Sequence, residues 1–509
     1  MQVVRYRKLF TTVSTMPCST KQVPGSRTSS NSRIGSIMLN TAFLPELALM
    51  LTVLVLFFMT LGKFRTGVIQ GASLFLTAVT LVATFVSMGA QDSLFYDAYL
   101  VDPLSQLFKM VIVGGLFLVF YLGRGLKGID GRLHPEYNMF LAISALGLMF
   151  LSSSVELLTL LLSLEISSYA LYVVIPFRGG QQRSHVEAGI KYVLFGAAST
   201  GLTLYGMSYI FGLAHTTYLN ELAQLMPSLV ATQPLAVVAM VLVMTAFFYK
   251  LALFPMHFWT PDVYQGASNE TTSFVATLPK VGAVLLLIRF VSVAGYDVSQ
   301  LTWVLAVVAV LSMTLGNFTA LVQTDLKRLL AYSSIAHAGY VMIGILTADE
   351  MGMSAAVFYV IGYLLMNLGC FYVIYNVAPN GENVSFDDLK GLSRRSPLLA
   401  LTLLVSAFGM AGIPPTIGFI GKFMLFTGAI HKGFYALVIL AVMNAAVAAF
   451  YYLKMARAAY CAPDSDQDVI VLPFTAKLLG AFFIVAIIMV GAMPQSILAA
   501  AKHAVATLL

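Results

Sequence analysis

The stretch "TAFFYKLALFPMHFWTPDVYQG", from Thr245 to Gly266, places a lysine inside a run of aromatic and aliphatic residues. Lys250 has apolar neighbours on both sides, and no other Lys or Arg occurs after Lys191 until this position. Pro255 follows closely, and a proline inside a helix removes a backbone donor and kinks or breaks the helix. A charged side chain beside a helix break in an apolar run indicates a functional position.

The composition of the whole chain indicates that lipid is its solvent. The 509 residues are 59% hydrophobic and 10% charged, whereas soluble domains carry roughly 25% charged residues. About fourteen apolar segments are long enough to span a bilayer as helices, and they do not alternate as the strands of a β-barrel would. They start near residues 42, 66, 104, 137, 157, 188, 233, 272, 300, 328, 354, 398, 433 and 475. The predicted fold is therefore an all-α polytopic membrane protein.

The net charge of +7 reflects membrane topology rather than a nucleic-acid partner, because basic residues mark cytoplasmic loops. Alternate predicted loops hold the basic residues Lys63/Arg65, Arg124/Lys127/Arg132, Arg178/Arg183, Lys327/Arg328, Lys390/Arg394/Arg395 and Lys454/Arg457. The intervening loops hold Asp92, Asp97, Glu221, Asp297, Asp349 and Glu350, with Lys432 as the clear exception. The alternation supports the number of segments and predicts that both ends of the helical core lie on the non-cytoplasmic side.

Residues 1–37 differ from the rest of the chain. They are basic, rich in Ser and Thr, and contain no acidic residue, which is typical of an organelle transit peptide. The alternative, which we favour, is an upstream translation start, since "MLNTAFLPELALMLTVLVLFF" from Met38 reads as a natural beginning. In either case we exclude this extension from the fold and treat residues 38–509 as the transmembrane domain.

Ionisable residues inside predicted spans are rare, expensive and usually functional. Six occur here in six different spans: Glu165, Lys191, Lys250, Lys280, His337 and Lys422. Lysine can give up its proton in a buried site and arginine cannot. Several buried lysines with one glutamate therefore predict a proton relay, in which water links the groups that do not touch.

Simpler interpretations exist for some of these positions. Lys191 can extend outward from its helix end and form an ordinary i, i+4 pair with Glu187. His337 can be a neutral core histidine bonded to a backbone carbonyl as readily as a relay member. Charged residues near predicted span ends are interpreted as surface features: Lys109 and Arg289 as anchors, and Glu156 as a helix start that faces water.

A second interrupted helix is predicted at "GIPPTIG", where Pro414 and Pro415 precede Lys422. The two proline breaks are about 160 residues apart, and paired broken helices in the two halves of a transporter indicate inverted repeats and an ion path between them. A structural kink alone is the alternative, but a lysine accompanies each break.

Four motifs carry a resemblance to a known family: "KLALFPMHFWTPDVYQGA", "EAGIKYVLFGAAS", "QTDLKRLLAYSSIAHAGY" and "GIPPTIGFIGKF". Together they resemble the antiporter-like subunits of respiratory complex I, the NADH:quinone oxidoreductase. The ending "TPDVYQGA" is most similar to the subunit N branch, the bacterial counterpart of mitochondrial subunit 2. The resemblance extends from roughly Met38 to the last span.

The resemblance implies a fold and a set of site residues. The family has fourteen helices, two inverted five-helix repeats, and discontinuous seventh and twelfth helices. By local motif, the family's charged positions are Glu165 on helix five, which pairs with Lys250 on helix seven, Lys191 on helix six, Lys280 on helix eight, His337 on helix ten and Lys422 on helix twelve near the exit.

The resemblance also implies a proton-translocating membrane-arm subunit without a redox site of its own. The chain has no GxGxxG strand–helix unit and no water-soluble domain to hold one. It also has no iron–sulfur spacing and no CxxC pair among its three cysteines. We therefore expect no cofactor or metal here, and FMN, iron–sulfur clusters, NADH and quinone in partner subunits. The expected partners are other membrane-arm subunits, both antiporter-like and small hydrophobic ones, in the bacterial cell inner membrane, or in an organelle inner membrane if residues 1–37 are a transit peptide.

Three alternatives remain open at this stage. A subunit of a multi-subunit sodium/proton antiporter shares the fold, although "TPDVYQGA" and the lysine in "GFIGKF" favour complex I. The homologous subunit of the photosynthetic plastoquinone complex shares the same first motif. A membrane scaffold with buried charges that serve only assembly is the third.

Overall fold

The computed structural model describes residues 41–180, 183–295, 299–461 and 468–508, so the basic extension 1–37 lies outside the described residues. Among the described residues, twelve helices are long and apolar enough to cross a membrane. The prediction of an all-α polytopic membrane protein is confirmed. The count of fourteen spans and the two inverted five-helix repeats stay predictions.

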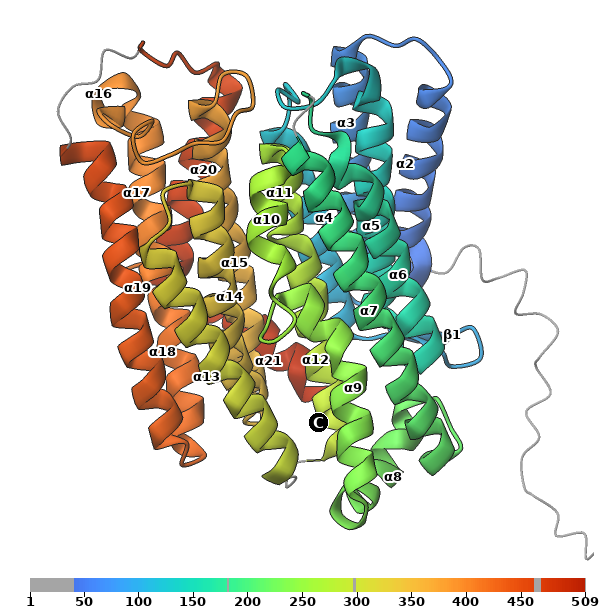
Figure 1. Ribbon diagram of the computed structural model, residues 1–509. Coiled ribbons are helices and arrows are strands. Elements are labelled where there is room, and N and C mark those ends of the chain that lie inside the picture. The colour runs from blue at the N-terminus through green and yellow to red at the C-terminus, as the bar shows by residue number, and fades with distance from the viewer. Residues whose placement is uncertain (1–40, 181–182, 296–298, 462–467, 509) are drawn as a thin grey trace, which may run out of the picture. The chain divides into compact units, whose positions relative to one another are not determined.

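Each predicted span begins close to the start of a helix (Figure 1). The helices are η2 (Thr41–Phe43), α2 (Leu44–Thr60), α3 (Thr66–Val86), α4 (Pro103–Leu122), η3 (Gly131–Leu133), α5 (His134–Ser153), α6 (Leu157–Val174), η4 (Ile175–Phe177), α7 (Arg183–Ala214), α8 (Leu219–Thr232), α9 (Pro234–Leu251), α10 (Trp259–Gly266), α11 (Asn269–Val275), α12 (Leu278–Ala294), α13 (Ser299–Leu321), α14 (Leu326–Ile345), α15 (Glu350–Val377), α16 (Leu392–Arg395), α17 (Pro397–Ala411), α18 (Ile417–His431), α19 (Tyr435–Cys461), α20 (Phe474–Ala492) and α21 (Gln495–Ala506).

The connection between α3 and α4 contains a short hairpin that the sequence analysis did not predict. Strands β1 (Asp92–Leu94) and β2 (Tyr99–Val101) pair antiparallel, with Asp92 opposite Val101. Figure 1 shows this hairpin at the end of the protein opposite the α2–α3 connection.

The basic loops gather at one end of the protein. The Lys127 ammonium, after α4, donates to the carbonyl of Ala378, after α15, at 3.3 Å. The Arg178 guanidinium, after α6, reaches the carbonyl of Gly381 at 3.2 Å. Three loops that the charge pattern assigned to the same side therefore meet.

The helix α9 ends where the quoted stretch predicted a break. Ala252 has φ 62°, and the Leu253 amide donates to the Phe248 carbonyl at 2.8 Å. This left-handed residue closes the last turn. The chain resumes a helix at Trp259, four residues after Pro255.

The second break has the same local geometry. α17 ends at Ala411, Gly412 has φ 88°, and the Ile413 amide donates to the Phe408 carbonyl at 2.9 Å. Pro414 and Pro415 then separate it from α18. Both predicted proline breaks are therefore interruptions between two helices.

Backbone groups freed at the first break find partners in neighbouring elements. The Phe254 amide donates to Ser312 Oγ of α13 at 2.9 Å, and Trp259 Nε1 donates to the Tyr249 carbonyl at 3.0 Å. Irregular backbone at membrane depth is tolerated only where protein or water satisfies it. Here the side chains of Ser312 and Trp259 satisfy the backbone groups.

The helix α12 lies at the centre of the packing. The most apolar part of the segment Asn269–Ala294 is entirely buried inside the protein, whereas that of Phe474–Ala492 is 28% buried. A residue on α12 therefore faces other helices rather than lipid.

Candidate functional site: buried lysines at two helix breaks

Lys280 of α12 binds the end of the first broken helix. Its ammonium donates to the Leu251 carbonyl at 3.0 Å and to Ser334 Oγ of α14 at 2.9 Å. Only 2% of Lys280 is exposed. The carbonyl of Leu251 is at the C-terminus of α9, where the helix dipole favours a cation. Lys280 therefore links the break to α14.

Lys422 of α18 binds the end of the second broken helix. Its ammonium donates to the carbonyls of Met410 at 2.9 Å and Ala411 at 3.0 Å. It also lies 4.9 Å from the centre of the Tyr340 ring, a cation–π contact. The lysine that the sequence predicts beside this break therefore donates hydrogen bonds to the backbone carbonyls at the end of α17.

The ammonium of Lys250 is held by weaker hydrogen bonding than the ammonium groups of Lys280 and Lys422. It is buried on the last turn of α9, and its ammonium has a single long hydrogen bond, to Tyr192 Oη of α7 at 3.4 Å. The rings of Tyr192 and Tyr249 lie within 5.8 Å of the ammonium. Lys250 is therefore enclosed by aromatic faces and keeps unused donor capacity.

Glu165 of α6 is also buried, and its carboxylate accepts a hydrogen bond from Thr200 Oγ1 at 2.6 Å. The ion pairs within 4 Å in the described part of the chain do not include one between Glu165 and Lys250. Their pairing during function stays a prediction.

His337 of α14 lies between two tyrosines. Its Nδ1 is 2.6 Å from Tyr359 Oη and its Nε2 is 2.9 Å from Tyr452 Oη. Tyr452 also bonds to Ser333. This arrangement differs from a core histidine tied to a backbone carbonyl, because each neighbour is a hydroxyl that can both donate and accept a proton.

The sequence analysis missed the hydroxyl groups that join these sites. Ser334 bonds to Lys280, and Tyr264 Oη lies 3.5 Å from Ser334 Oγ. Tyr359 packs over the His337 ring at a centroid distance of 5.8 Å. Tyrosine and serine occur throughout the spans. Only the positions of Ser334, Tyr264 and Tyr359 in the fold distinguish them from the other tyrosines and serines.

Lys191 lies near the surface, at the end of the protein that carries the basic loops. It forms the predicted i, i+4 pair with Glu187 at 2.6 Å and a second pair with Asp262 of α10 at 2.5 Å. Asp262 also binds Arg328 of α14 at 2.7 Å. The network joins α7, α10 and α14 at a solvent-accessible position.

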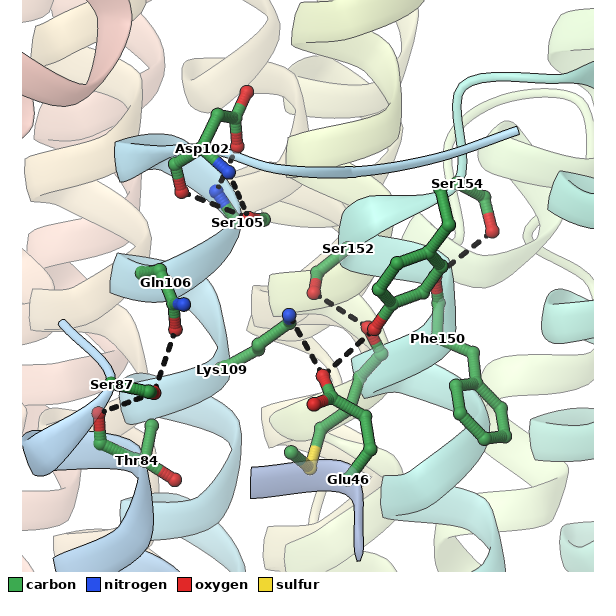
Figure 2. Close-up of polar contacts among 12 residues, drawn as sticks. Glu46, Thr84, Ser87, Asp102, Ser105, Gln106, Lys109, Phe150, Ser152 and Ser154 are labelled. Carbon is green, nitrogen blue, oxygen red and sulfur yellow. Dashed lines mark hydrogen bonds and ion pairs between the residues drawn. The ribbon is translucent and has the colours of Figure 1, made fainter. Parts of the chain in front are cut away.

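Two predicted surface anchors are wrong. Lys109 is fully buried and lies 2.7 Å from Glu46 of α2, and Arg289 is buried and lies 2.8 Å from Asp102. Figure 2 shows Lys109 pointing toward Glu46 in the interior. Position near a span end does not reveal burial, because neighbouring helices and the hairpin cover these turns.

Two further surface predictions need correction. Glu156 begins α6, as predicted, with its carboxylate accepting from the Thr159 amide at 2.7 Å, but it is buried rather than facing water. Lys327, assigned to a basic loop, is buried at the start of α14 and donates to the Ala267 carbonyl at 2.8 Å. In both cases tertiary packing supplies a partner that the local sequence does not show.

Comparisons with known proteins identify the family. The model of the NADH:quinone oxidoreductase/Mrp antiporter transmembrane family matches residues 154–448. NADH-quinone oxidoreductase subunit N 2 of Solidesulfovibrio magneticus is 48% identical over 89% of this chain and 96% of that protein. The protein of the same name from Opitutus terrae is 44% identical over 92% and 98%. The chain belongs to the NADH-quinone oxidoreductase subunit N family.

Solved structures agree with this family. A chain in respiratory complex I from Thermus thermophilus with bound aureothin matches with a TM-score of 0.79 and 30% identity, over 90% of this chain and all of that one. A chain of the Mrp complex from Dietzia sp. matches with a TM-score of 0.81 at 18% identity, which shows a shared fold. Both breaks and Lys250, Lys280 and Lys422 lie within residues 154–448, which the family model matches.

Proposed function

We propose that this chain is a proton-translocating membrane-arm subunit of an NADH-quinone oxidoreductase in a bacterial inner membrane. Quinone reduction in other subunits supplies the energy, and NADH, FMN, iron–sulfur clusters and quinone bind to those subunits rather than to this one. Its partners are other antiporter-like and small hydrophobic membrane subunits. The relatives named subunit N, at up to 48% identity, support this assignment over a free-standing antiporter.

The observation that carries the proposal is the series of ionisable groups across the protein interior. Glu165 and Lys250 begin it, Lys280 and Ser334 continue it, and His337 follows one turn later on α14. Lys422 lies at the second break. Lysine, carboxylate, imidazole and hydroxyl can all take up and release a proton, and intervening water would join those that do not touch.

Lys250 has the clearest role in this mechanism. Its ammonium has one weak neutral hydrogen bond, so it can move between Glu165 and the Lys280 side without losing several contacts. When it approaches Glu165, opposite charges stabilise the ammonium. When it moves away, burial without a neighbouring carboxylate disfavours the charge and the proton passes on.

Substitution of Lys250 tests the function. We expect Lys250→Ala to lose most of the proton pumping that this subunit contributes, measured as proton uptake by membrane vesicles during NADH oxidation, with the complex fully assembled. Lys250→Arg should not restore pumping, since arginine keeps its charge but does not release it. Wild-type pumping by assembled Lys250→Ala complex would refute the relay.

Copurification decides between the two partner assignments. Isolation of the chain together with NADH dehydrogenase activity supports the complex I assignment. Isolation with other sodium/proton antiporter subunits, and without that activity, would support the antiporter alternative, whose fold this chain shares.

A further inference from the structure

A second group of buried ionisable side chains lies on α2, β2 and α4, and Figure 2 shows two of its members, Glu46 and Lys109. Lys109 Nζ is 2.7 Å from Glu46 Oε1, and both side chains are fully buried. The Tyr99 hydroxyl donates to the same carboxylate oxygen at 2.8 Å. The Lys109 ammonium also lies 5.2 Å from the centre of the Tyr99 ring.

The contacts of this pair are incomplete. Within the described residues, Glu46 Oε2 has no hydrogen-bond partner, and Lys109 Nζ has none beyond its ion pair. Replacement of a buried ion pair by apolar residues is often neutral or stabilising, so such a pair is weak evidence for stability. Ionisable groups in a membrane interior mark ion and proton pathways by default. A purely structural contact would be expected to satisfy the remaining donors and acceptor.

A second ion pair connects this group to the helix that carries Lys280. Asp102 caps α4, and its carboxylate accepts two hydrogen bonds from Arg289 Nη2, at 2.8 Å and 2.9 Å. Arg289 lies on α12, about two and a half helical turns beyond Lys280. The two ion pairs thus involve α2, α4 and α12, and α12 also carries Lys280.

The same group lies beside a hollow at the protein surface. A cavity of about 640 Å³ is lined by residues of the hairpin and of α12, including Asp97, Leu100, Asp102 and Arg289. Asp97 is exposed, and Leu100 directly follows Tyr99 on β2. This end of the protein is opposite the basic α2–α3 connection (Figure 1). Tyr99 is itself buried, and the residues that follow it on β2, Leu100 and Val101, line the hollow.

We propose that Glu46 and Lys109 form a second proton-exchanging pair, which releases protons into this hollow. The Lys109 ammonium transfers a proton across the 2.7 Å contact to Glu46, which leaves a neutral amine and a neutral carboxylic acid. The acid then releases the proton through water beside Tyr99, and the amine takes up the next proton from the protein interior. One proton enters and one leaves per cycle. The inference rests on the proposed pumping function.

The decisive variant is Lys109→Arg, which keeps the positive charge beside Glu46 but cannot give up its proton. In the complete assembled complex, we expect it to lose proton uptake per NADH oxidised. The double variant Glu46→Leu/Lys109→Met leaves no unpaired charge, so it should assemble and also lose pumping. Thr52→Val is the matched control, because Thr52 is a buried polar residue on the same helix as Glu46, bonded to the Ala48 carbonyl; it should pump as the wild type does.

A second readout reports on the acid itself. Infrared difference spectra between resting and turning-over complex should contain a protonated-carboxyl band that Glu46→Gln removes. Wild-type pumping by Lys109→Arg, or by the double variant, would assign the pair a structural role and overturn the proposal. A failure of the relay as a whole is distinguishable, because Lys250→Ala would then pump normally in the same vesicles.

Discussion

The helices that precede the two breaks, α9 and α17, end with the same backbone turn. The lysines that bind their terminal carbonyls come from different positions in the chain. At the second break the lysine comes from the helix that follows, where Lys422 reaches the carbonyls of Met410 and Ala411. At the first break it comes from elsewhere, since Lys280 of α12 binds the Leu251 carbonyl. Lys250, on the broken helix itself, is left with one long bond to Tyr192.

The difference separates two roles of a buried lysine: stabilising the end of a broken helix, and moving between proton-exchange partners. The C-terminus of a broken helix carries unsatisfied carbonyls and a partial negative charge, which an ammonium stabilises. Lys280 and Lys422 occupy such positions, so they stabilise the breaks in addition to the part we propose for them in the relay. No carbonyl among the described residues holds the Lys250 ammonium, so Lys250 is the group best placed to move.

The largest expected effects follow removal of the two carbonyl-bound lysines. Lys280→Met and Lys422→Met should both lose pumping, and each should also destabilise the protein by about 1–3 kcal/mol per carbonyl left without a donor. Lys250→Met should lose pumping with a smaller loss of stability. Vesicle proton uptake and thermal unfolding of the purified complex measure the two effects.

The control for that comparison is Lys432→Met, just after α18, where the side chain is 41% exposed and 4.0 Å from Asp349. It should leave both measurements unchanged. Equal destabilisation by Lys250→Met and Lys280→Met would contradict the division between a mobile and an anchored lysine.

The next effect concerns Glu165, the acid that we propose controls Lys250. Glu165→Ala removes the opposite charge and should strongly reduce proton uptake, whereas Glu165→Asp keeps the charge and should be milder. Thr200→Val removes the hydroxyl that donates to the carboxylate at 2.6 Å and should fall between Glu165→Asp and the wild type. If Glu165→Ala pumps normally in assembled complex, Lys250 does not depend on this carboxylate.

A smaller effect is expected at the backbone of the first break. Ser312→Ala leaves the Phe254 amide without its acceptor, and we expect a loss of about 1–3 kcal/mol in stability. Ser228→Ala, which removes an exposed hydroxyl bonded within its own helix, serves as the control. Thermal unfolding curves that coincide for the two variants would show that water satisfies the Phe254 amide.

The smallest effects compare the left-handed residues of the two breaks. Gly412 has φ 88°, and a Cβ there would lie 3.1 Å from Lys422 Cδ, so Gly412→Ala should cost about 1–2 kcal/mol. Ala252 already adopts φ 62°. Ala252→Gly should relieve the strain of this left-handed conformation but stabilise the protein by less than about 1 kcal/mol, because glycine also adds backbone entropy to the unfolded chain. Destabilisation by Ala252→Gly would show that the Ala252 methyl group contributes packing there.

Much of this architecture was predictable from local sequence. A span requires a length of apolar chain, and Pro255, Pro414 and Pro415 remove backbone donors wherever they stand, so segment positions and helix breaks follow from residues adjacent in the chain. The same reasoning found Lys250 and Lys280, because a charge deep in an apolar run cannot reach water by extending its side chain.

Burial near span ends was not predictable in the same way. Lys109 and Arg289 looked like surface anchors, yet Glu46 and Asp102 enclose them from segments distant in sequence. Tyr359, Tyr452 and Ser334 were overlooked for a related reason, since a hydroxyl in a span has no charge to mark it.

That this chain lies in lipid, where its helices break and which side chains bring charge into the interior all follow from composition and from the covalent chemistry of proline. Which partner each charge has depends instead on the packing of the helices. Lys280 rather than Lys250 binds the end of α9, and Lys109 binds Glu46, because a hydrogen bond or ion pair depends on a distance of a few ångströms between atoms on different helices, and that distance is set by how the helices pack.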